Sequence, residues 1–269
     1  MSDPINLDAY LGRIGYTGPR EPTLATLSAI QKAHMSRIPF ENLDVLLDRG
    51  IRLDLDSLQK KLVMAKRGGY CFEHSTLLAQ VLEQLGFSVE RHAARVVLFL
   101  NAREAPRTHM FLVVELPEGK FVVDPGFGGS GAWFPIPLVE SGTQPTHWIA
   151  REGRNIILRF RRDGAAVDGW VSDCEETNNP IDFEMGNHMT STHPNSPFKQ
   201  IIMMSIVTPT GRVTVMNRDV TFRSGDDVTP LQLANRGAFR DLLVEHYGFD
   251  LPEFDTLRIP AIPEWDERE

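Results

Sequence analysis

The chain has 269 residues, 42% of them hydrophobic, and a formal net charge of −8 at pH 7. That is enough for a sizeable core in two or three domains, and the acidic balance argues against nucleic-acid binding. No stretch approaches the roughly 18 apolar residues that a membrane-spanning helix needs. The N-terminus has no basic segment followed by an apolar one, so we expect no signal peptide. With only two cysteines and no disulfide framework, we expect a cytoplasmic protein.

Residues 1–86 are expected to be mainly helical. Polar residues that cap helices precede apolar-periodic segments at three places: Asn6 or Asp8, Thr23, and Asp54 or Asp56. The first helix is expected to stop near Gly15. Pro39 cannot continue the second helix, so residues 39–42 are expected to form an irregular connector.

The most informative stretch is RGGYCFE, residues 67–73. An apolar-periodic segment follows it and ends at Gly86, which predicts a helix with Cys71 in its first turn. Unpaired N–H groups and the positive end of the helix dipole favour a thiolate at that position. Cys71 is therefore the candidate nucleophile. Cys174, between two acidic residues, is expected to be an ordinary unreactive cysteine.

After Gly86 the pattern changes to β-branched and apolar runs that are typical of strands. Strands are expected at 89–100, 110–116, 121–123, 201–207, 212–216 and 220–222, with turns at 117–120, 152–155 and 163–164. The polar stretch 187–197 is expected to connect domains, and residues 238–247 to form a helix ended by Gly248. Runs of helices followed by runs of strands predict an α+β fold.

A cysteine nucleophile needs a base, and the base needs a group that orients it. His109 opens one apolar strand, and Asp124 ends the next. A hairpin centred on residues 118–119 would pair Asp124 with Val113, which shares a face with His109 but is four residues, about 13 Å, away. A bulge, twist or longer loop must then close the gap. His74 is expected to be a packing residue behind the site.

Residues 125–129, PGFGG, have two interpretations. They form either a tight turn between strands or a place where backbone N–H groups approach a ligand such as a pyrophosphate. No metal site is predicted, because the two cysteines are far apart and no Cys-x-x-Cys or His-Glu-x-x-His pattern occurs.

Four stretches together resemble the arylamine N-acetyltransferase family: 67–73, THM at 108–110, VDPGFGG at 123–129 and IPFENL at 38–43. They are similar to its nucleophile, histidine, aspartate and N-terminal motifs, in family order. The resemblance implies a catalytic triad of Cys71, His109 and Asp124 in a cysteine-protease-like core. It also implies a helical bundle (1–86), a central antiparallel β-barrel (87–198) and a C-terminal α/β lid (199–269).

The resemblance further implies ping-pong transfer of an acetyl group from acetyl-coenzyme A, through a thioester on Cys71, to arylamines, arylhydrazines or N-hydroxyarylamines. The implied coenzyme A contacts are Thr108, Gly126, Phe127 and Gly128. The implied acceptor pocket consists of Ile38, Val97, Phe127 and Phe198. No partner other than these small molecules is expected, neither nucleic acid nor membrane, and the protein is expected to be a monomer or a weak homo-oligomer.

Two supporting features accompany the implied triad. Arg67 and Glu41 are expected to form a buried pair that fixes the Cys71 loop, the alternative being two independent surface charges. The backbone N–H of Phe72 is a candidate for stabilising the tetrahedral oxyanion.

Three other functions remain open. A thiol hydrolase or transglutaminase-like enzyme has the same Cys–His–Asp order, with water or a lysine as acceptor. A polyketide amide synthase would have a wider acceptor cleft. A non-catalytic module that binds coenzyme A or an aryl ligand would keep its function when Cys71 is replaced by serine.

Overall fold

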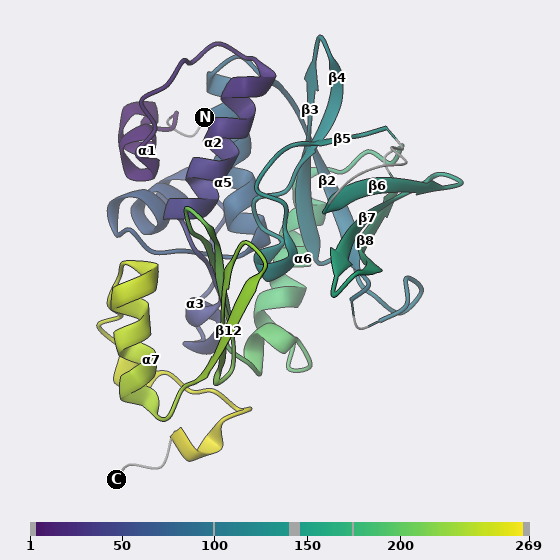
Figure 1. Cartoon of the computed structure of the whole chain (residues 1–269). Coiled ribbons are helices and arrows are strands. Elements are labelled where there is room, and N and C mark those ends of the chain that lie inside the picture. Colours follow the sequence, from purple (N-terminus) through teal and green to yellow (C-terminus); the bar gives the residue numbers. More distant parts are fainter. Residues whose placement is uncertain (1–3, 99, 140–145, 174, 266–269) are drawn as a thin grey trace.

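The computed structural model describes residues 4–98, 100–139, 146–173 and 175–265. Figure 1 shows N-terminal helices, a strongly curved antiparallel sheet and a second sheet flanked by a C-terminal helix. The α+β fold predicted from the sequence is therefore confirmed. The three domain boundaries stay a prediction, and Cys174 lies outside the described residues. None of the helices in the described ranges is long and apolar enough to cross a bilayer.

The N-terminal region forms helices where polar caps precede apolar stripes. They are α1 (Leu7–Ile14), α2 (Leu24–Arg37), α3 (Leu43–Leu46), α4 (Leu55–Leu58), its π-helical continuation η1 (Gln59–Met64) and α5 (Cys71–Gln84). The side chains of Asn6, Thr23 and Asp54 each accept a backbone N–H three residues on, as N-caps do. Gly15 ends α1 in the left-handed conformation, φ 68°. The apolar faces of α1, α2, α4 and η1 pack into one core with α5, whereas Leu43 and Leu46 of α3 pack into the core of the C-terminal region.

The middle of the chain forms a seven-stranded antiparallel sheet. In spatial order its strands are β5 (Ile136–Pro137), β4 (Gly119–Val123), β3 (His109–Leu116), β2 (Ser88–Val96), β8 (Ala165–Asp173), β7 (Asn155–Arg162) and β6 (His147–Glu152). Its edge strands β5 and β6 lie next to one another, so the sheet is a nearly closed barrel. The short 3₁₀ turn η2 (Gly128–Ser130) follows β4. Buried apolar side chains, among them Trp170, Phe111 and Leu158, fill the interior of the barrel.

The second sheet has the order β1 (Phe40–Glu41), β9 (Met203–Val207), β10 (Gly211–Met216), β11 (Asp219–Ser224) and β12 (Asp227–Gln232). Helix α7 (Arg236–Leu242), its π-helical continuation η4 (Leu243–Tyr247) and the 3₁₀ turns η5 (Phe254–Thr256) and η6 (Pro263–Trp265) complete the C-terminal region. One prediction was wrong here, and one strand was not predicted. Residues 40–41 are not irregular, because they pair with β9. Strand β12 went unpredicted because it is exposed throughout and contains Pro230, which an edge strand tolerates.

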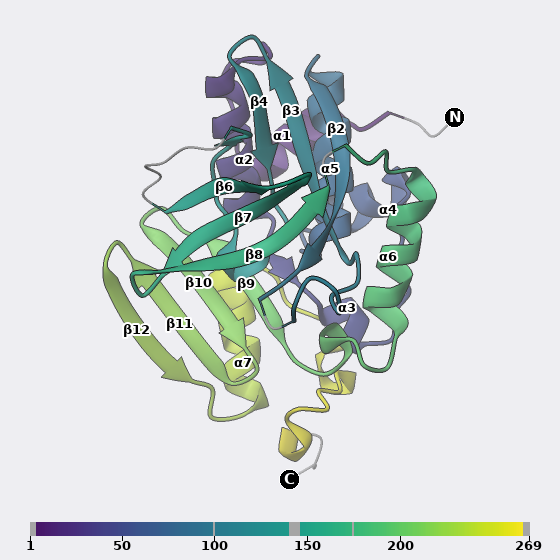
Figure 2. The same ribbon diagram turned by 90° about the vertical axis from the view of Figure 1, so that its right-hand side faces the viewer.

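The polar stretch 187–197 is not simply a connector, because its first half is the end of helix α6 (Pro180–Thr192). Asn179 and Asp182 cap this helix reciprocally, and Pro180 suits its first turn. Figure 2 shows α6 on the outside of the molecule. Asn187 is polar yet buried, since its side chain donates to the Ile51 carbonyl and contacts the Tyr70 hydroxyl. The turn η3 (Pro197–Lys199) follows.

Candidate active site

Cys71 is the first residue of α5 and is 3% exposed. Glu73 orders the start of the helix, because its carboxylate accepts the Tyr70 N–H at 3.0 Å. The loop after β4 packs directly on the cysteine. A Cβ atom at Gly126 would lie 2.4 Å from the Cys71 Cα, so only glycine fits there. The Cys71 Sγ lies 3.6 Å from the Thr108 carbonyl oxygen, immediately before β3.

His109 and Asp124 form a buried hydrogen-bonded pair on neighbouring strands. The His109 Nε2–H donates to Asp124 Oδ2 at 2.9 Å, and each side chain is 3% exposed. The other carboxylate oxygen, Oδ1, accepts the Gly126 N–H at 3.3 Å. Asp124 therefore fixes both the histidine ring and the loop that covers Cys71.

The pKa of His109 is raised to about 10. Burial alone would lower it, since a charged imidazole loses hydration in the interior. The charge and hydrogen bond of Asp124, followed by those of Cys71, outweigh burial. His109 therefore carries a positive charge at neutral pH and interacts with Cys71.

The β3–β4 hairpin differs from its predicted register, and the difference brings the pair together. Leu116 pairs with Gly119 across a two-residue turn, and Val113 pairs with Val122, not Asp124. Continued by one step, this register places Asp124 opposite position 111, two residues from His109 instead of four. The remaining distance is about 7 Å along the strand, which two side chains span. The predicted centre at residues 118–119 was wrong, and neither a bulge nor a longer loop is required.

Trp170 is a site residue that sequence reasoning missed. Its indole N–H donates to the same Asp124 Oδ2 at 2.9 Å, and its ring stacks on Phe111 with centroids 4.2 Å apart. The available signal was a tryptophan inside an apolar strand, since a buried indole N–H needs an acceptor. Three donors, from His109, Trp170 and Gly126, thus fix the position of the Asp124 carboxylate.

The residues predicted to contact coenzyme A or the acceptor have different surroundings in the structure. Phe127 is 9% exposed and its ring centroid is 5.1 Å from that of His109. Thr108 is half-buried beside Cys71. Ile38 and Gly128 line one small pocket with Phe40 and Pro125. Val97 and Phe198 are half-buried but are not among the lining residues of that pocket; Phe198 packs edge-on against Phe40 and Tyr70.

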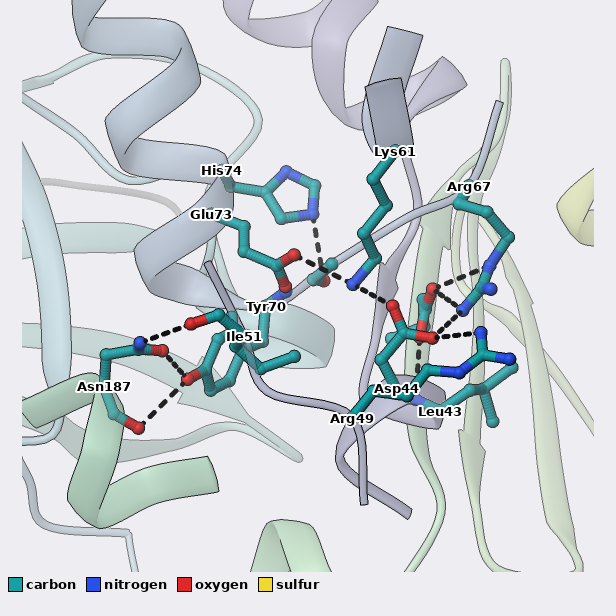
Figure 3. Close-up of polar contacts among 12 residues, drawn as sticks. Leu43, Asp44, Arg49, Ile51, Lys61, Arg67, Tyr70, Glu73, His74 and Asn187 are labelled. Carbon is teal, nitrogen blue, oxygen red and sulfur yellow. Dashed lines mark hydrogen bonds and ion pairs between the residues drawn. The ribbon is translucent and has the colours of Figure 1, made fainter. Parts of the chain in front are cut away.

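Arg67 and Glu41 form a buried ion pair, so these residues are not independent surface charges. The Arg67 Nη2–H donates to Glu41 Oε1 at 2.7 Å, with side chains 10% and 0% exposed. Figure 3 shows that Arg67 belongs to a larger network that includes Asp44, Lys61 and Glu73. Arg67 also contacts Asp44 at 3.2 Å, and Lys61 bridges Asp44 and Glu73 at 2.8 Å each. A continuous chain of charges thus runs from Arg67 to the first turn of α5.

Breaking the Arg67–Glu41 pair is expected to destabilise the fold non-additively. Arg67→Ala leaves the buried Glu41 carboxylate without its ion-pair partner, which costs about 3–5 kcal/mol, whereas Glu41→Ala leaves Arg67 with Asp44 alone and should cost less. The double variant should lose at least about 1 kcal/mol less than the sum of the two, measured by urea unfolding. The exposed pair Arg20–Asp8 is the control, and its coupling should stay within about 0.5 kcal/mol. Additive losses at Arg67 and Glu41 would contradict the expectation.

His74 does more than pack behind the site. Its Nε2 lies 3.1 Å from both the Pro39 and Gly69 carbonyl oxygens, which only accept hydrogen bonds, so Nε2 carries the hydrogen. Its Nδ1 then accepts from the His34 Nε2–H at 2.7 Å, and His34 Nδ1 accepts from the Tyr10 hydroxyl at 2.8 Å. This buried chain ties α1 and α2 to the backbone just before Cys71.

Because both histidines are neutral in the fold, stability is expected to fall in mild acid. Burial lowers the pKa of His74 to about 4 and that of His34 well below 6.5. The unfolded chain then binds more protons, so this contribution is full above pH 6.5 and is lost as pH falls toward 4. The slope is about 1.4 kcal/mol per pH unit for each such histidine. The free energy of unfolding, measured in urea from pH 7 to 4.5, should depend less steeply on pH in the double variant His34→Gln/His74→Gln than in the exposed control His188→Gln. Equal pH dependence in the two variants would contradict this.

A cysteine at the start of a helix, beside a buried histidine–carboxylate pair, is the arrangement of enzymes that form acyl intermediates on a cysteine. Comparison with known proteins narrows this class. The N-acetyltransferase family model matches residues 23–256. The arylamine N-acetyltransferase of Escherichia coli is 36% identical over 254 residues, 92% of this chain and 90% of that protein. The chain belongs to the arylamine N-acetyltransferase family.

Two further relatives agree with this assignment. A Salmonella typhimurium arylamine N-acetyltransferase / N-hydroxyarylamine O-acetyltransferase is 34% identical over 248 residues, 90% of this chain and 88% of that protein. The Mycobacterium marinum arylamine N-acetyltransferase in complex with CoA superposes with a TM-score of 0.87 at 31% identity, over 93% of this chain and 94% of that one. The protein is thus an acyltransferase of a family that binds coenzyme A.

Proposed function

We propose that the protein transfers an acetyl group from acetyl-coenzyme A, through a thioester on Cys71, to arylamines and arylhydrazines and to the oxygen of N-hydroxyarylamines. The observation that carries the proposal is the charged His109, held by Asp124 and coupled to Cys71. The CoA complex of the M. marinum relative supports the donor, and the two activities named for the S. typhimurium relative support the acceptors.

The first half-reaction starts from the Cys71 thiolate and the His109 imidazolium. The sulfur attacks the acetyl carbonyl carbon, and we propose that the backbone N–H of Phe72, in the first turn of α5, stabilises the oxyanion. When the tetrahedral intermediate collapses, the new bond to Cys71 remains and the bond to the coenzyme A sulfur breaks. His109 gives its proton to the departing coenzyme A thiolate and becomes neutral.

The second half-reaction uses His109 as a base. An aromatic amine is weakly basic, so at neutral pH its nitrogen is largely unprotonated and ready to attack the thioester. The neutral imidazole accepts the proton that the nitrogen loses, while the Cys71 thiolate leaves. Asp124 stabilises the imidazolium that forms, and the enzyme returns to its starting state.

The residues around Cys71 fit an approaching coenzyme arm. The proposed contacts are Thr108, Gly126, Phe127 and Gly128. Gly126 presents bare backbone against Cys71, where a side chain would fill the space. For the acceptor we propose Ile38 and Phe127, together with Val97 and Phe198, which are not lining residues of the pocket that Ile38 lines. Apolar walls suit a flat aromatic ring. A cytoplasmic location and a monomeric or weakly oligomeric state stay predictions.

A substrate panel tests the proposal. Release of free coenzyme A from acetyl-coenzyme A would be measured with aniline-type arylamines, arylhydrazines and an alkylamine control. We expect release that depends on the aromatic acceptor, with little release when the acceptor is omitted. Hydrolysis of an aryl acetate without any gain on adding arylamine would instead support the thiol hydrolase alternative.

A further inference from the structure

Arg212 is a buried cation at the junction between the C-terminal sheet and the candidate active site. It lies on β10, is 5% exposed, and donates from Nη1 to the Gly128 carbonyl at 2.6 Å and from Nη2 to the Gly131 carbonyl at 2.5 Å. Its guanidinium also lies over the Trp133 ring, 5.5 Å from the centroid. Within the described ranges, no carboxylate lies at ion-pair distance from it. A charge this deeply buried is normally paired with an acid.

The two halves of the loop after Asp124 are held by different groups. The first half is fixed within the candidate site, because Gly126 bonds to Asp124 and Phe127 packs on His109. The second half, Gly128–Gly131, has its two end carbonyls fixed by Arg212. Gly128 adopts φ +60°, a conformation that favours glycine. The loop is therefore ordered from the cysteine on one side and from the C-terminal sheet on the other.

We propose that Arg212 is a positioning residue for the acyl donor, which fixes the Gly128–Gly131 turn so that it can receive the coenzyme A arm. The inference rests on the proposed function, in which Gly128 contacts coenzyme A. Two features make the role specific to the donor. Arg212 acts on the far half of the loop, away from Asp124, and its uncompensated positive charge favours an anionic ligand in a poorly hydrated surrounding.

The test compares Arg212→Met with Arg212→Lys and with a matched control. Arg223 pairs directly with Arg212 across β10 and β11 but is exposed, so Arg223→Met makes the same chemical change without touching the turn. Four quantities would be measured: KM for acetyl-coenzyme A, kcat, turnover of p-nitrophenyl acetate, and the Kd of coenzyme A by calorimetry. Thermal unfolding of each variant checks folding.

For Arg212→Met we expect KM for acetyl-coenzyme A and Kd for coenzyme A to rise about tenfold, because the charge-assisted hydrogen bonds that hold the turn are lost. Turnover of p-nitrophenyl acetate should stay within about twofold of wild type. Arg212→Lys should recover part of the affinity, and Arg223→Met should match wild type. Unchanged KM and Kd in Arg212→Met would overturn the inference about Arg212 but not the proposed function. An equal loss of activity with acetyl-coenzyme A and with p-nitrophenyl acetate would do the same. A wild type that turns over the ester but neither binds coenzyme A nor consumes acetyl-coenzyme A would overturn the proposed function and, with it, the inference.

Discussion

Replacing Cys71 by alanine is expected to abolish arylamine-dependent release of coenzyme A, with kcat lower by about 10⁴-fold or more. The reason is that Cys71 supplies the sulfur that holds the acetyl group between the two half-reactions. Cys71→Ser should be nearly as inactive, because His109 is poised to stabilise a thiolate and a hydroxyl is far less acidic. Coenzyme A binding should be retained in both variants.

Mass spectrometry provides the direct measurement. Wild type mixed with acetyl-coenzyme A and no acceptor should carry one acetyl group on the peptide that contains Cys71, and adding an arylamine should remove it. Neither variant should be acetylated. An unmodified Cys71 peptide in wild type, or full activity of Cys71→Ser, would contradict the thioester route.

Local signals in the sequence were sufficient to predict most helices and their caps. Asn6, Thr23 and Asp54 act as N-caps because cap chemistry depends only on the next three residues. The placement of Cys71 at the first position of α5 followed from the same kind of local evidence. Local sequence signals did not predict the π-helical continuations of α4 and α7, because these depend on packing around the helix.

The candidate site was predictable in its residues but not in its geometry. His109 and Asp124 stand at strand ends, which the hydrophobic pattern reveals. Their separation depends on which two residues make the turn between β3 and β4. The structure uses 117–118, and a shift of the hairpin centre by one residue changed the pairing by two positions. Turn type thus decides whether these side chains meet.

Contacts between distant segments account for what sequence reasoning missed. Trp170 follows Asp124 by 46 residues, and the carbonyls that Arg212 binds precede it by more than 80. The contact between His34 and His74 was not evident from the sequence, because it forms only when α2 and α5 pack together. Each of these buried side chains needs its hydrogen-bond partner, because a buried donor without an acceptor costs stability. Such pairings become visible only when the topology is known.

Replacing Asp124 by asparagine is expected to lower kcat by about 10³- to 10⁴-fold with little change in overall fold. An amide has one oxygen and one NH₂ group, whereas Asp124 accepts from His109, Trp170 and Gly126. In either amide orientation, at least one donor then faces another donor. The negative charge that keeps the pKa of His109 near 10 is also lost, so burial lowers that pKa and the imidazole becomes neutral.

The pH dependence separates this effect from simple misfolding. The raised pKa of His109 gives wild type a stability contribution that is full below pH 6.5 and is lost as pH rises through about 10. Asp124→Asn should lack this contribution, so its stability relative to wild type should improve between pH 6.5 and 10. Iodoacetamide should alkylate its Cys71 more slowly at pH 6, because the imidazolium no longer favours the thiolate. Asp168→Asn, a matched change on β8 beside Arg159, should behave as wild type in both assays. If Asp124→Asn keeps kcat within tenfold of wild type and alkylates with the wild-type pH profile, Asp124 does not orient or charge His109 in the reaction.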